Sequence, residues 1–543
     1  MPPAHAQRVR RWRIRICAQA VVPALLLLLA CTEAAWAQSF AMYDLRVDGR
    51  VLTLIPADLN RDRRPDLLVI SKKGTFPQEA RWASVFWQQE GGGFNVHPDL
   101  VWEVDPEATV IDVGPLGPDP DEQAIVYLAG SEVRFYQLED GTRPAPRTLL
   151  KSPTFTVFPE PGDLPPWTLI HDWKGLGHPW LGVPEFGKLM LYPLGVDGQL
   201  TVGEPVHVYQ PTRVSTGDDS HRLLRDYSLQ LVYRFPQLFV QDFNGDGRAD
   251  LIVAWQEDVA VHLQDASGHF PPHPSQTFHF DLRTEREKSL RTVLVTPLVE
   301  DLNQDGYADL ILTKMTGRAT ERRIVTAVYR NQGGSLPSKP DAQIEHEGFG
   351  TTLLVKDING DGKRDLIFPL VKIGVANLVR NLLTSRVDVS LFAHLYQGQP
   401  AYLPAADWTR TFGYQVDMSD GVRLEGAWPN IEGDFDGDGR ADLLVSGNHE
   451  LSVYLAIAGA SFAPDPAIRL KVKTSPYLLV RDLNNDGLAD ILMWYDREPE
   501  WRGVMKVLMN TGRGWANKAD PRGAEAVAPL PTCSSQEQRD CER

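Results

Sequence analysis

A short acidic phrase recurs along this chain and constrains its fold more than any other feature. The phrase reads Asp, any residue, Asn or Asp, any residue, Asp-Gly, two further residues and Asp, and a run of β-formers follows it. Five complete copies begin at Asp242, Asp301, Asp357, Asp434 and Asp482. A sixth copy keeps the oxygen-bearing residues but has Arg63 where the others have glycine. The identical internal spacing indicates a structural repeat.

The phrase predicts a calcium-binding loop. Ca²⁺ takes roughly six to eight oxygen ligands and tolerates irregular geometry. Side chains at positions 1, 3, 5 and 9 can point inward if the backbone curls around a centre, and the glycine at position 6 permits the turn. Position 7, whose side chain varies, is expected to contribute only its carbonyl.

The predicted ligands follow directly from these positions. In the five complete copies they are Asp242, Asn244, Asp246 and Asp250; Asp301, Asn303, Asp305 and Asp309; Asp357, Asn359, Asp361 and Asp365; Asp434, Asp436, Asp438 and Asp442; and Asp482, Asn484, Asp486 and Asp490. In the sixth copy they are Asp58, Asn60, Asp62 and Asp66. The prediction is five calcium sites, with a sixth if the loop that contains Arg63 also binds.

Two other interpretations of the phrase are an EF-hand and an ordinary acidic turn. An EF-hand needs a bidentate Glu at position 12 and flanking helices, whereas position 12 here is apolar and lies in a strand-like run. Ordinary acidic turns are the second alternative, because Asp, Asn and Gly are common turn formers. Five copies with one spacing favour a metal site over chance turns.

The repeat predicts an all-β fold. Two eroded copies, which begin at Asp112 and Asp172, fill the long gap after the first loop and lack the ligand set, so they are not expected to bind calcium well. With them the chain has eight units, each with several short strands. Such units indicate an eight-bladed β-propeller, or a seven-bladed one if an eroded unit is an insertion. Residues 40–47, which have no unit of their own, are expected to complete the last blade.

The loops followed by Leu-Ile-Val, in blades that end with Gly-x-Phe, resemble the FG-GAP/VCBS repeat family. The resemblance covers nearly all of residues 38–518. Family members, including the head of integrin α subunits, are calcium-binding β-propellers engaged in adhesion and ligand recognition. Some relatives are lectins, and eight-bladed calcium propellers include polysaccharide lyases. The resemblance therefore implies the fold more directly than the activity.

The first 37 residues have the organisation of a signal peptide. A basic segment precedes an apolar stretch at residues 20–30, and Ala35-Trp36-Ala37 fits signal peptidase cleavage. Residues 28–31 resemble a lipobox, so a lipid anchor at Cys31 is the alternative. Both interpretations predict an exported protein without a transmembrane span, which is periplasmic, associated with the outer membrane or extracellular.

The C-terminal residues 519–543 are predicted to be a polar tail outside the propeller. Cys533 and Cys541 lie in this tail, and a disulfide between them suits an exported protein. Two free thiols are the alternative. Neither pairing nor oligomeric state follows from the sequence alone.

The charge and motif content narrow the function. With 71 acidic and 55 basic residues, the net charge of −16 argues against a nucleic acid or an anionic membrane as partner. The sequence holds no metalloprotease, serine-hydrolase, phosphate-binding or Cys-x-x-Cys motif. The prediction is a non-catalytic binding or cell-adhesion module for glycan or protein ligands. The alternatives are a calcium-dependent polysaccharide lyase or related carbohydrate-active enzyme, whose groups several blades could assemble, and a periplasmic assembly scaffold.

Two segments interrupt the repeat length and are candidate functional insertions. They are residues 212–222, which are polar, and residues 374–385, which are apolar at helical spacing. Loops on rigid scaffolds often carry function. The alternative for residues 374–385 is that they pack on a face of the propeller.

Overall fold

A computed structural model describes most of the chain between Ser39 and Trp515. The described residues are 39–74, 78–117, 119–138, 144–151, 163–194, 200, 202–209, 212–218, 227–290, 293–317, 322–350, 353–371, 384–417, 423–457, 461–496, 498–513 and 515. The chain divides into two compact units, one of which is Phe40–Thr511 and the other the two terminal stretches. The predicted signal peptide, Cys31, the polar tail and the cysteines in it lie outside the described residues.

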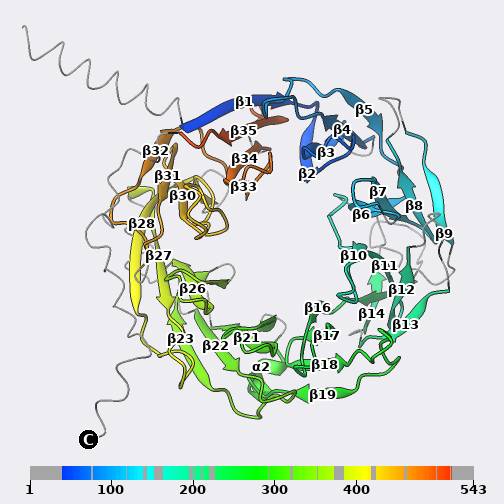
Figure 1. Cartoon of the computed structure of the whole chain (residues 1–543), viewed down its shortest axis with the longest axis vertical. Helices are drawn as coiled ribbons and strands as arrows, with labels where there is room; N and C mark the ends of the chain where they lie inside the picture. The colour runs from blue at the N-terminus through cyan, green and yellow to red at the C-terminus, as the bar shows by residue number, and fades with distance from the viewer. Residues whose placement is uncertain are drawn as a thin grey trace, which may run out of the picture. The chain divides into compact units, whose positions relative to one another are not determined.

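The unit Phe40–Thr511 is an eight-bladed β-propeller, as predicted. Its antiparallel sheets follow one another along the chain, and Figure 1 shows them in a ring with strands such as β2, β6, β10 and β16 innermost. Blades 1 to 4 are formed by β2 (Arg50–Ala57), β3 (Asp66–Lys73), β4 (Ala80–Phe86) and β5 (Leu100–Glu103); β6 (Ala108–Pro115), β7 (Gln123–Ala129), β8 (Glu132–Tyr136) and β9 (Arg147–Lys151); β10 (Ile170–His171), β11 (Trp180–Glu185), β12 (Lys188–Pro193) and β13 (Glu204–His207); and β16 (Gln237–Gln241), β17 (Asp250–Trp255), β18 (Asp258–His262) and β19 (Gln276–His279).

The remaining blades vary more in their strands. They are formed by β20 (Leu294–Glu300), β21 (Asp309–Thr316), β22 (Arg323–Tyr329) and β23 (Ala342–Glu347); β24 (Phe349–Gly350), β25 (Leu354–Lys356), β26 (Asp365–Val371), β27 (Arg386–His394), β28 (Trp408–Asp417) and β29 (Arg423–Leu424); β30 (Leu443–Gly447), β31 (Glu450–Tyr454) and β32 (Ile468–Lys471); and β33 (Tyr477–Arg481), β34 (Asp490–Tyr495), β35 (Val504–Asn510) and β1 (Phe40–Arg46). The eight-unit count made from the sequence is therefore confirmed, and both eroded units are true blades.

The first strand of the chain closes the ring. Strand β1 pairs antiparallel with β35, from Phe40 opposite Asn510 to Arg46 opposite Val504. The expectation that residues 40–47 complete the last blade is confirmed. Closure matters because it joins the two ends of the repeat and leaves no large sheet edge between the first and last blades.

The hydrophobic core lies between neighbouring blades. The second strand of a blade, such as β3 or β17, is buried along nearly its whole length because both faces of its sheet meet another blade. One cluster joins Phe243, Ile252 and Val261 of blade 4 to Leu310 and Ala327 of blade 5. This two-sided burial explains why these strands read as continuous apolar runs.

One predicted insertion forms a hairpin between blades 3 and 4. Strands β14 (Thr212–Asp218) and β15 (Tyr227–Tyr233) pair antiparallel as a separate two-stranded sheet. The other predicted insertion, residues 374–385, lies outside the described residues except for its last two positions. Within the described part of the chain, no helix has the length and apolarity needed to cross a membrane.

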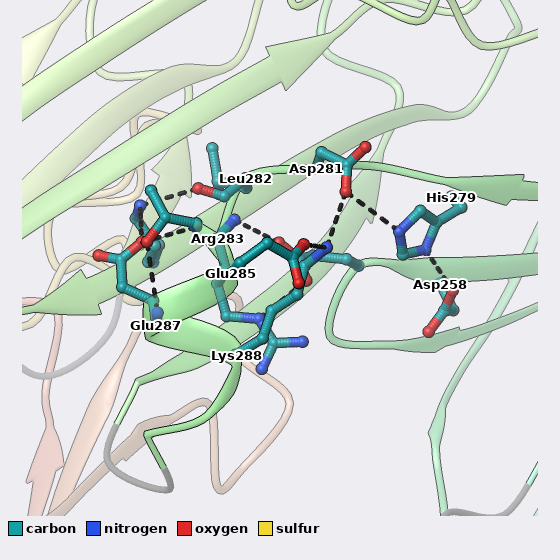
Figure 2. A network of polar contacts seen from close by, with 11 residues as sticks. Asp258, His279, Asp281, Leu282, Arg283, Glu285, Glu287 and Lys288 are labelled. Atoms are coloured by element: carbon teal, nitrogen blue, oxygen red, sulfur yellow. Dashed lines mark hydrogen bonds and ion pairs between the residues drawn. The ribbon is translucent and has the colours of Figure 1, made fainter.

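A polar network fixes the connection between blades 4 and 5 (Figure 2). The single-turn helix α2 (Glu285–Lys288) begins with a capping box in which Thr284 and Glu287 satisfy each other's backbone N–H groups. The guanidinium of Arg283 donates to the buried Glu257 carboxylate at 2.8 Å. The ammonium of Lys288 lies 2.9 Å from carboxylate oxygens of both Asp281 and Glu285. The segment that connects blades 4 and 5 is thereby held against blade 4.

Candidate metal centres and the links between blades

The six acidic loops occupy equivalent places in their blades. Each follows the innermost segment of a blade and leads into the next strand, so that the position-9 aspartate stands at or beside the start of β3, β17, β21, β26, β30 or β34. Connections between the same two strands lie at one end of every blade. The fold therefore gathers all six loops on one face of the propeller.

The first aspartate curls each loop around itself. In blade 4, Asp242 accepts the backbone N–H groups of Gly245 through Oδ1 and Gly247 through Oδ2, both at 2.7 Å. Asp434 accepts the same two positions of its loop at 2.7 Å. In the copy without glycine, Asp58 accepts the N–H of Arg63 at 2.7 Å. The sixth copy thus folds like the other five.

Positions 3 and 5 continue the same turn. Asn244 accepts the N–H of Asp246 at 3.1 Å and donates to its carboxylate at 2.9 Å, and Asp246 accepts the N–H of Arg248 at 3.0 Å. The corresponding bonds recur in the loops that begin at Asp58, Asp301, Asp357 and Asp482. The loop backbone therefore orders the predicted ligands by itself.

Two positions of each loop adopt positive φ, although the sequence pointed to only one. Position 6 has φ between 80° and 85° where it is glycine, and Arg63 has φ of 65°. Position 4 is also positive, at 74° for Gly245, 58° for Gln304 and 59° for Asn485. This region strains residues with a side chain, and Asn is among those that enter it most readily. The varied residues at position 4 hid this requirement in the sequence.

The position-9 aspartates are buried and anchor the loops to the sheets. Asp250 accepts the N–H of Phe243 at 3.0 Å and the N–H of Gln264, just beyond β18, at 2.8 Å. Equivalent pairs of bonds hold the position-9 aspartate in the other five copies. Each loop is therefore tied to the end of the third strand of its own blade.

Burial also changes the acidity of these carboxyls. Burial, together with the nearby Asp436 and Asp434 charges, raises the pKa of Asp442 to about 7 despite its two N–H bonds. Burial likewise raises the pKa of Asp66, Asp309 and Asp490 to about 7, that of Asp365 to about 6, and that of Asp250. A cation in the loop would relieve this repulsion.

The donor set fits a hard cation. All 24 predicted ligands are carboxylate or amide oxygens, which Ca²⁺ prefers, and each group of four lies within one curled loop. In blade 7, oxygens of Asp434, Asp436 and Asp442 lie within 4.8 Å of one another, the one such group of three acids, histidines or cysteines in the described part of the chain. Only this copy has a carboxylate at position 3, where the other five have asparagine, so it is the one loop in which these three positions are all acids.

The side chain at position 7 does more than the sequence suggested. Arg64 lies 2.5 Å from the Asp62 carboxylate, and Arg248 and Arg440 form the same pair with Asp246 and Asp438. These arginines neutralise one outer carboxylate in three of the six loops. In blade 5, Tyr307 at position 7 instead lies over the preceding loop, where a Cβ on Gly245 would come within 2.4 Å of its ring.

The eroded loops keep their fold without the ligand set. Asp172 still accepts the N–H groups of Leu176 at 2.9 Å and Gly177 at 2.7 Å. Its loop has Lys174 at position 3 and Trp180 at position 9. In blade 2, Asp112 accepts the N–H groups of Leu169 and Ile170, which begin the next blade.

Amide side chains link neighbouring blades beside the loops, and the acidic phrase of the sequence gives no indication of them. Gln88 donates to the carbonyl of Leu483 at 2.6 Å, and Gln264 to that of Lys174 at 2.8 Å. Asn331 and Asn510 make the same link to the preceding blade, to Phe243 and Phe435, both at 2.8 Å. All four follow a valine by three residues, at Val85, Val261, Val328 and Val507, a signal that was present in the sequence.

Backbone bonds connect adjacent loops as well. The N–H of Ala308 donates to the carbonyl of Asp242 at 2.9 Å, and that of Ala489 to the carbonyl of Asp434 at 2.7 Å. The eighth position of one loop is thus bonded to the first position of the loop before it. A change in the conformation of one loop is therefore transmitted through this bond to the neighbouring loop.

The closed ring and its repeated loops define the class, an eight-bladed β-propeller with acidic loops on one face. The family model for the FG-GAP-like repeat matches residues 301–368 and 434–515, so the resemblance noted in the sequence is confirmed there. The chain is thus an eight-bladed β-propeller that carries FG-GAP-like repeats at residues 301–368 and 434–515.

One curated relative and two solved structures are similar to parts of the chain. Phosphatidylinositol-glycan-specific phospholipase D of Mus musculus is 29% identical over 157 residues, which is 27% of this chain and only 17% of that protein. An Agrocybe aegerita lectin that recognises non-reducing terminal N-acetylglucosamine aligns with a TM-score of 0.39 at 14% identity, over 88% of this chain and 96% of that one. The β-propeller domain of Myceliophteria thermophila Cps50 aligns with a TM-score of 0.28 at 10% identity, over 87% and 98%. Because both TM-scores are low, the fold assignment rests on strand order and on the repeat match.

Proposed function

We propose that this protein is an exported, calcium-stabilised β-propeller that acts as a non-catalytic binding module for glycan or protein ligands. The observation that carries the proposal is the common geometry of the six loops. Each is curled by its first aspartate, anchored by its ninth and placed on the same face of a rigid ring. Rigid scaffolds that present loops on one face are typical of recognition modules.

Calcium would be held by the side-chain oxygens at positions 1, 3, 5 and 9 of each loop. When bound, it would neutralise clustered carboxylates whose charges otherwise repel one another. Since adjacent loops are bonded through Ala308 and Ala489, an ordered loop also stiffens the contact between blades. At about 1 mM Ca²⁺ and a Kd of about 10⁻⁴ M, linkage stabilises the fold by roughly 1.4 kcal/mol per site.

Export is proposed from the organisation of residues 1–37, with a basic segment, an apolar stretch and a cleavage motif. An exported protein meets calcium at the millimolar levels that such low-affinity modules use. The net charge of −16 fits a protein that neutral glycans or basic protein surfaces can approach.

The calcium part of the proposal is tested by thermal unfolding of the purified full chain in Ca²⁺, in Mg²⁺ and in chelator. We expect Ca²⁺ to raise Tm by several degrees and Mg²⁺ to do much less. Asp436→Asn should reduce the calcium response, whereas Asp265→Asn, an exposed acid outside the loops, should not. A melting curve that chelation leaves unmoved would mean that the loops are only turns.

The binding part is tested separately on a glycan array, and by capture of a purified protein partner, in calcium and in chelator. A calcium-dependent glycan hit would support the module and supply a polymer to test for cleavage. Release of unsaturated or reducing-end products from that polymer would show that the protein is an enzyme instead.

A further inference from the structure

A large cavity lies along the inner strands of blades 3 to 5. Its volume is about 1050 Å³, just above the roughly 300–1000 Å³ usual for small-molecule sites. The wall runs from residues 166–173 at the entry of blade 3, across β16 and β20, to Leu353 at the start of blade 6. None of the acidic loop ligands lines it, so this site is distinct from the candidate metal centres.

One end of the cavity is aromatic. Trp167 and Phe235 meet edge to face with their ring centres 5.7 Å apart, and His171 and Trp173 do so at 5.3 Å. Both Trp167 and Phe235 are only half-buried, so part of each ring faces the cavity. This end offers apolar surface for a flat or extended body.

The other end is aliphatic. Leu294 pairs with Met315 across β20 and β21, and Thr296 pairs with Thr313 one step along on the same face. Leu294 is 47% exposed, although it belongs to a strand whose alternate residues are buried. An exposed leucine inside a concave wall is typical of a surface that an apolar ligand covers.

A single guanidinium interrupts this apolar wall. The Nε of Arg322 is buried and has no hydrogen-bond partner, and its guanidinium forms no ion pair within the described part of the chain. Among the described residues that line the cavity there is no aspartate or glutamate. Arg330 and Arg440 also have a buried Nε without a partner, but each pairs with an aspartate through Nη2, whereas half-buried Arg322 has no such pair among the described residues.

These observations define the complementary ligand. Arg322 is half-buried, and its buried Nε–H without a partner is unfavourable. A carboxylate satisfies such a guanidinium best, because two N–H groups can donate to it in parallel. The apolar and aromatic walls require that the rest of the ligand also be apolar. We propose that this cavity binds an organic carboxylate with an extended apolar body, with its carboxylate on Arg322 and its body along β20 and β16 toward Trp167.

This site goes beyond the proposed calcium-stabilised binding module, which requires no cavity. Either proposal, the calcium-stabilised module or the cavity site, can therefore be refuted without affecting the other. Calcium-dependent melting and array binding test the module, whereas a small apolar acid tests the cavity.

The test is isothermal titration of the purified full chain with octanoate, with octan-1-ol and with galacturonate. Octanoate has both a carboxylate and an apolar chain. Octan-1-ol has the apolar chain without the carboxylate, and galacturonate has a carboxylate on a polar ring. We expect one octanoate per chain and about tenfold or more weaker binding of the other two. Equal binding of octanoate and octan-1-ol by the unaltered chain would overturn the role of Arg322, and no octanoate binding by a folded chain would overturn the site.

Variants then locate the site. Arg322→Gln and Leu294→Asp should each weaken octanoate binding about tenfold. Arg323→Gln is the matched control, because Arg323 is the next residue but is exposed and lies 3.9 Å from Glu347. Unchanged affinity in a folded Arg322→Gln chain, or an equal loss in Arg323→Gln, would refute the assignment.

Discussion

The ammonium of Lys174 lies 2.7 Å from Oε2 of Glu204 and is almost fully buried. It also stands 4.0 Å from the centre of the Trp180 ring, and Oε1 of Glu204 lies 2.8 Å from Nδ1 of His269. Lys174 and Trp180 occupy positions 3 and 9 of the eroded loop in blade 3. Where the six acidic loops have the predicted metal ligands, this loop therefore contains its own cation.

Replacing Lys174 by Met should destabilise the protein by about 2 kcal/mol, because Glu204 loses its buried partner and Trp180 its cation. Equilibrium unfolding in urea measures this loss, which should be the same in calcium and in chelator. Lys151→Met is the control, since the Lys151 side chain is 75% exposed in its pair with Glu132. A loss that disappears in chelator would contradict a metal-independent role.

Replacing Asn331 by Leu should cost about 3 kcal/mol. The side chain donates to the carbonyls of Phe243 and Ala308 and accepts the N–H groups of Gly334 and Ser335, so its removal leaves several buried backbone groups unsatisfied. Urea unfolding of Gln332→Leu, an exposed neighbour, provides the comparison. Similar stability of the two variants would show that the link between blades 4 and 5 contributes little.

Replacing Gly245 by Ala should destabilise blade 4 by about 2–3 kcal/mol for two separable reasons. Gly245 has φ of 74°, and a Cβ there would meet the ring of Tyr307 at 2.4 Å. Gly177 has a similar φ of 80°, but a Cβ added there would have no atom within 4 Å. Gly177→Ala therefore measures the cost of the backbone strain alone. Adding Tyr307→Ala to Gly245→Ala should restore part of the loss, and the absence of any rescue in this double-mutant cycle would rule out the clash.

Protonation of the Glu287 carboxylate should make the protein less stable in acid. Burial tends to raise its pKa, but hydrogen bonds from Thr284, Thr316 and Lys314 prevail and lower it to about 2, from its usual value of 4.5. Because the folded-state pKa is depressed, the stabilisation is complete above pH 4.5 and is lost as the pH falls toward 2. The shift is worth at most about 3 kcal/mol.

The measurement is urea unfolding between pH 5.5 and 3 for the wild-type chain and for Glu287→Gln, which should lose stability less steeply. Glu285→Gln is the control, because Glu285 lies in the same helical turn (Figure 2) but is highly exposed. Parallel curves for the wild type and Glu287→Gln would refute the assignment of the acid sensitivity to this carboxylate.

The local chemistry of the repeat was readable from the sequence because it depends on residues close together in the chain. The spacing from Asp242 to Asp250 forces a curled loop, since the first aspartate can reach only the N–H groups three to five residues on. The following apolar run predicts a buried strand. Counting these phrases, including the eroded ones, predicted eight blades and the closing role of residues 40–47. Whether the loops bind calcium stays a prediction.

The contacts between blades were decided by the tertiary structure. Asn331 reaches Phe243 across 88 residues of sequence and Gln88 reaches Leu483 across 395, distances over which a sequence pattern carries no geometry. The burial of the Lys174 ammonium and the cavity that Arg322 lines likewise depend on packing between blades. The positive φ at position 4 is instead a local feature, which the varied residues at that position conceal. The sequence alone determined how each unit folds, through short-range hydrogen bonds and alternating apolar residues. Only the closed ring determined which side chains meet between units, because burial there depends on the neighbouring blade.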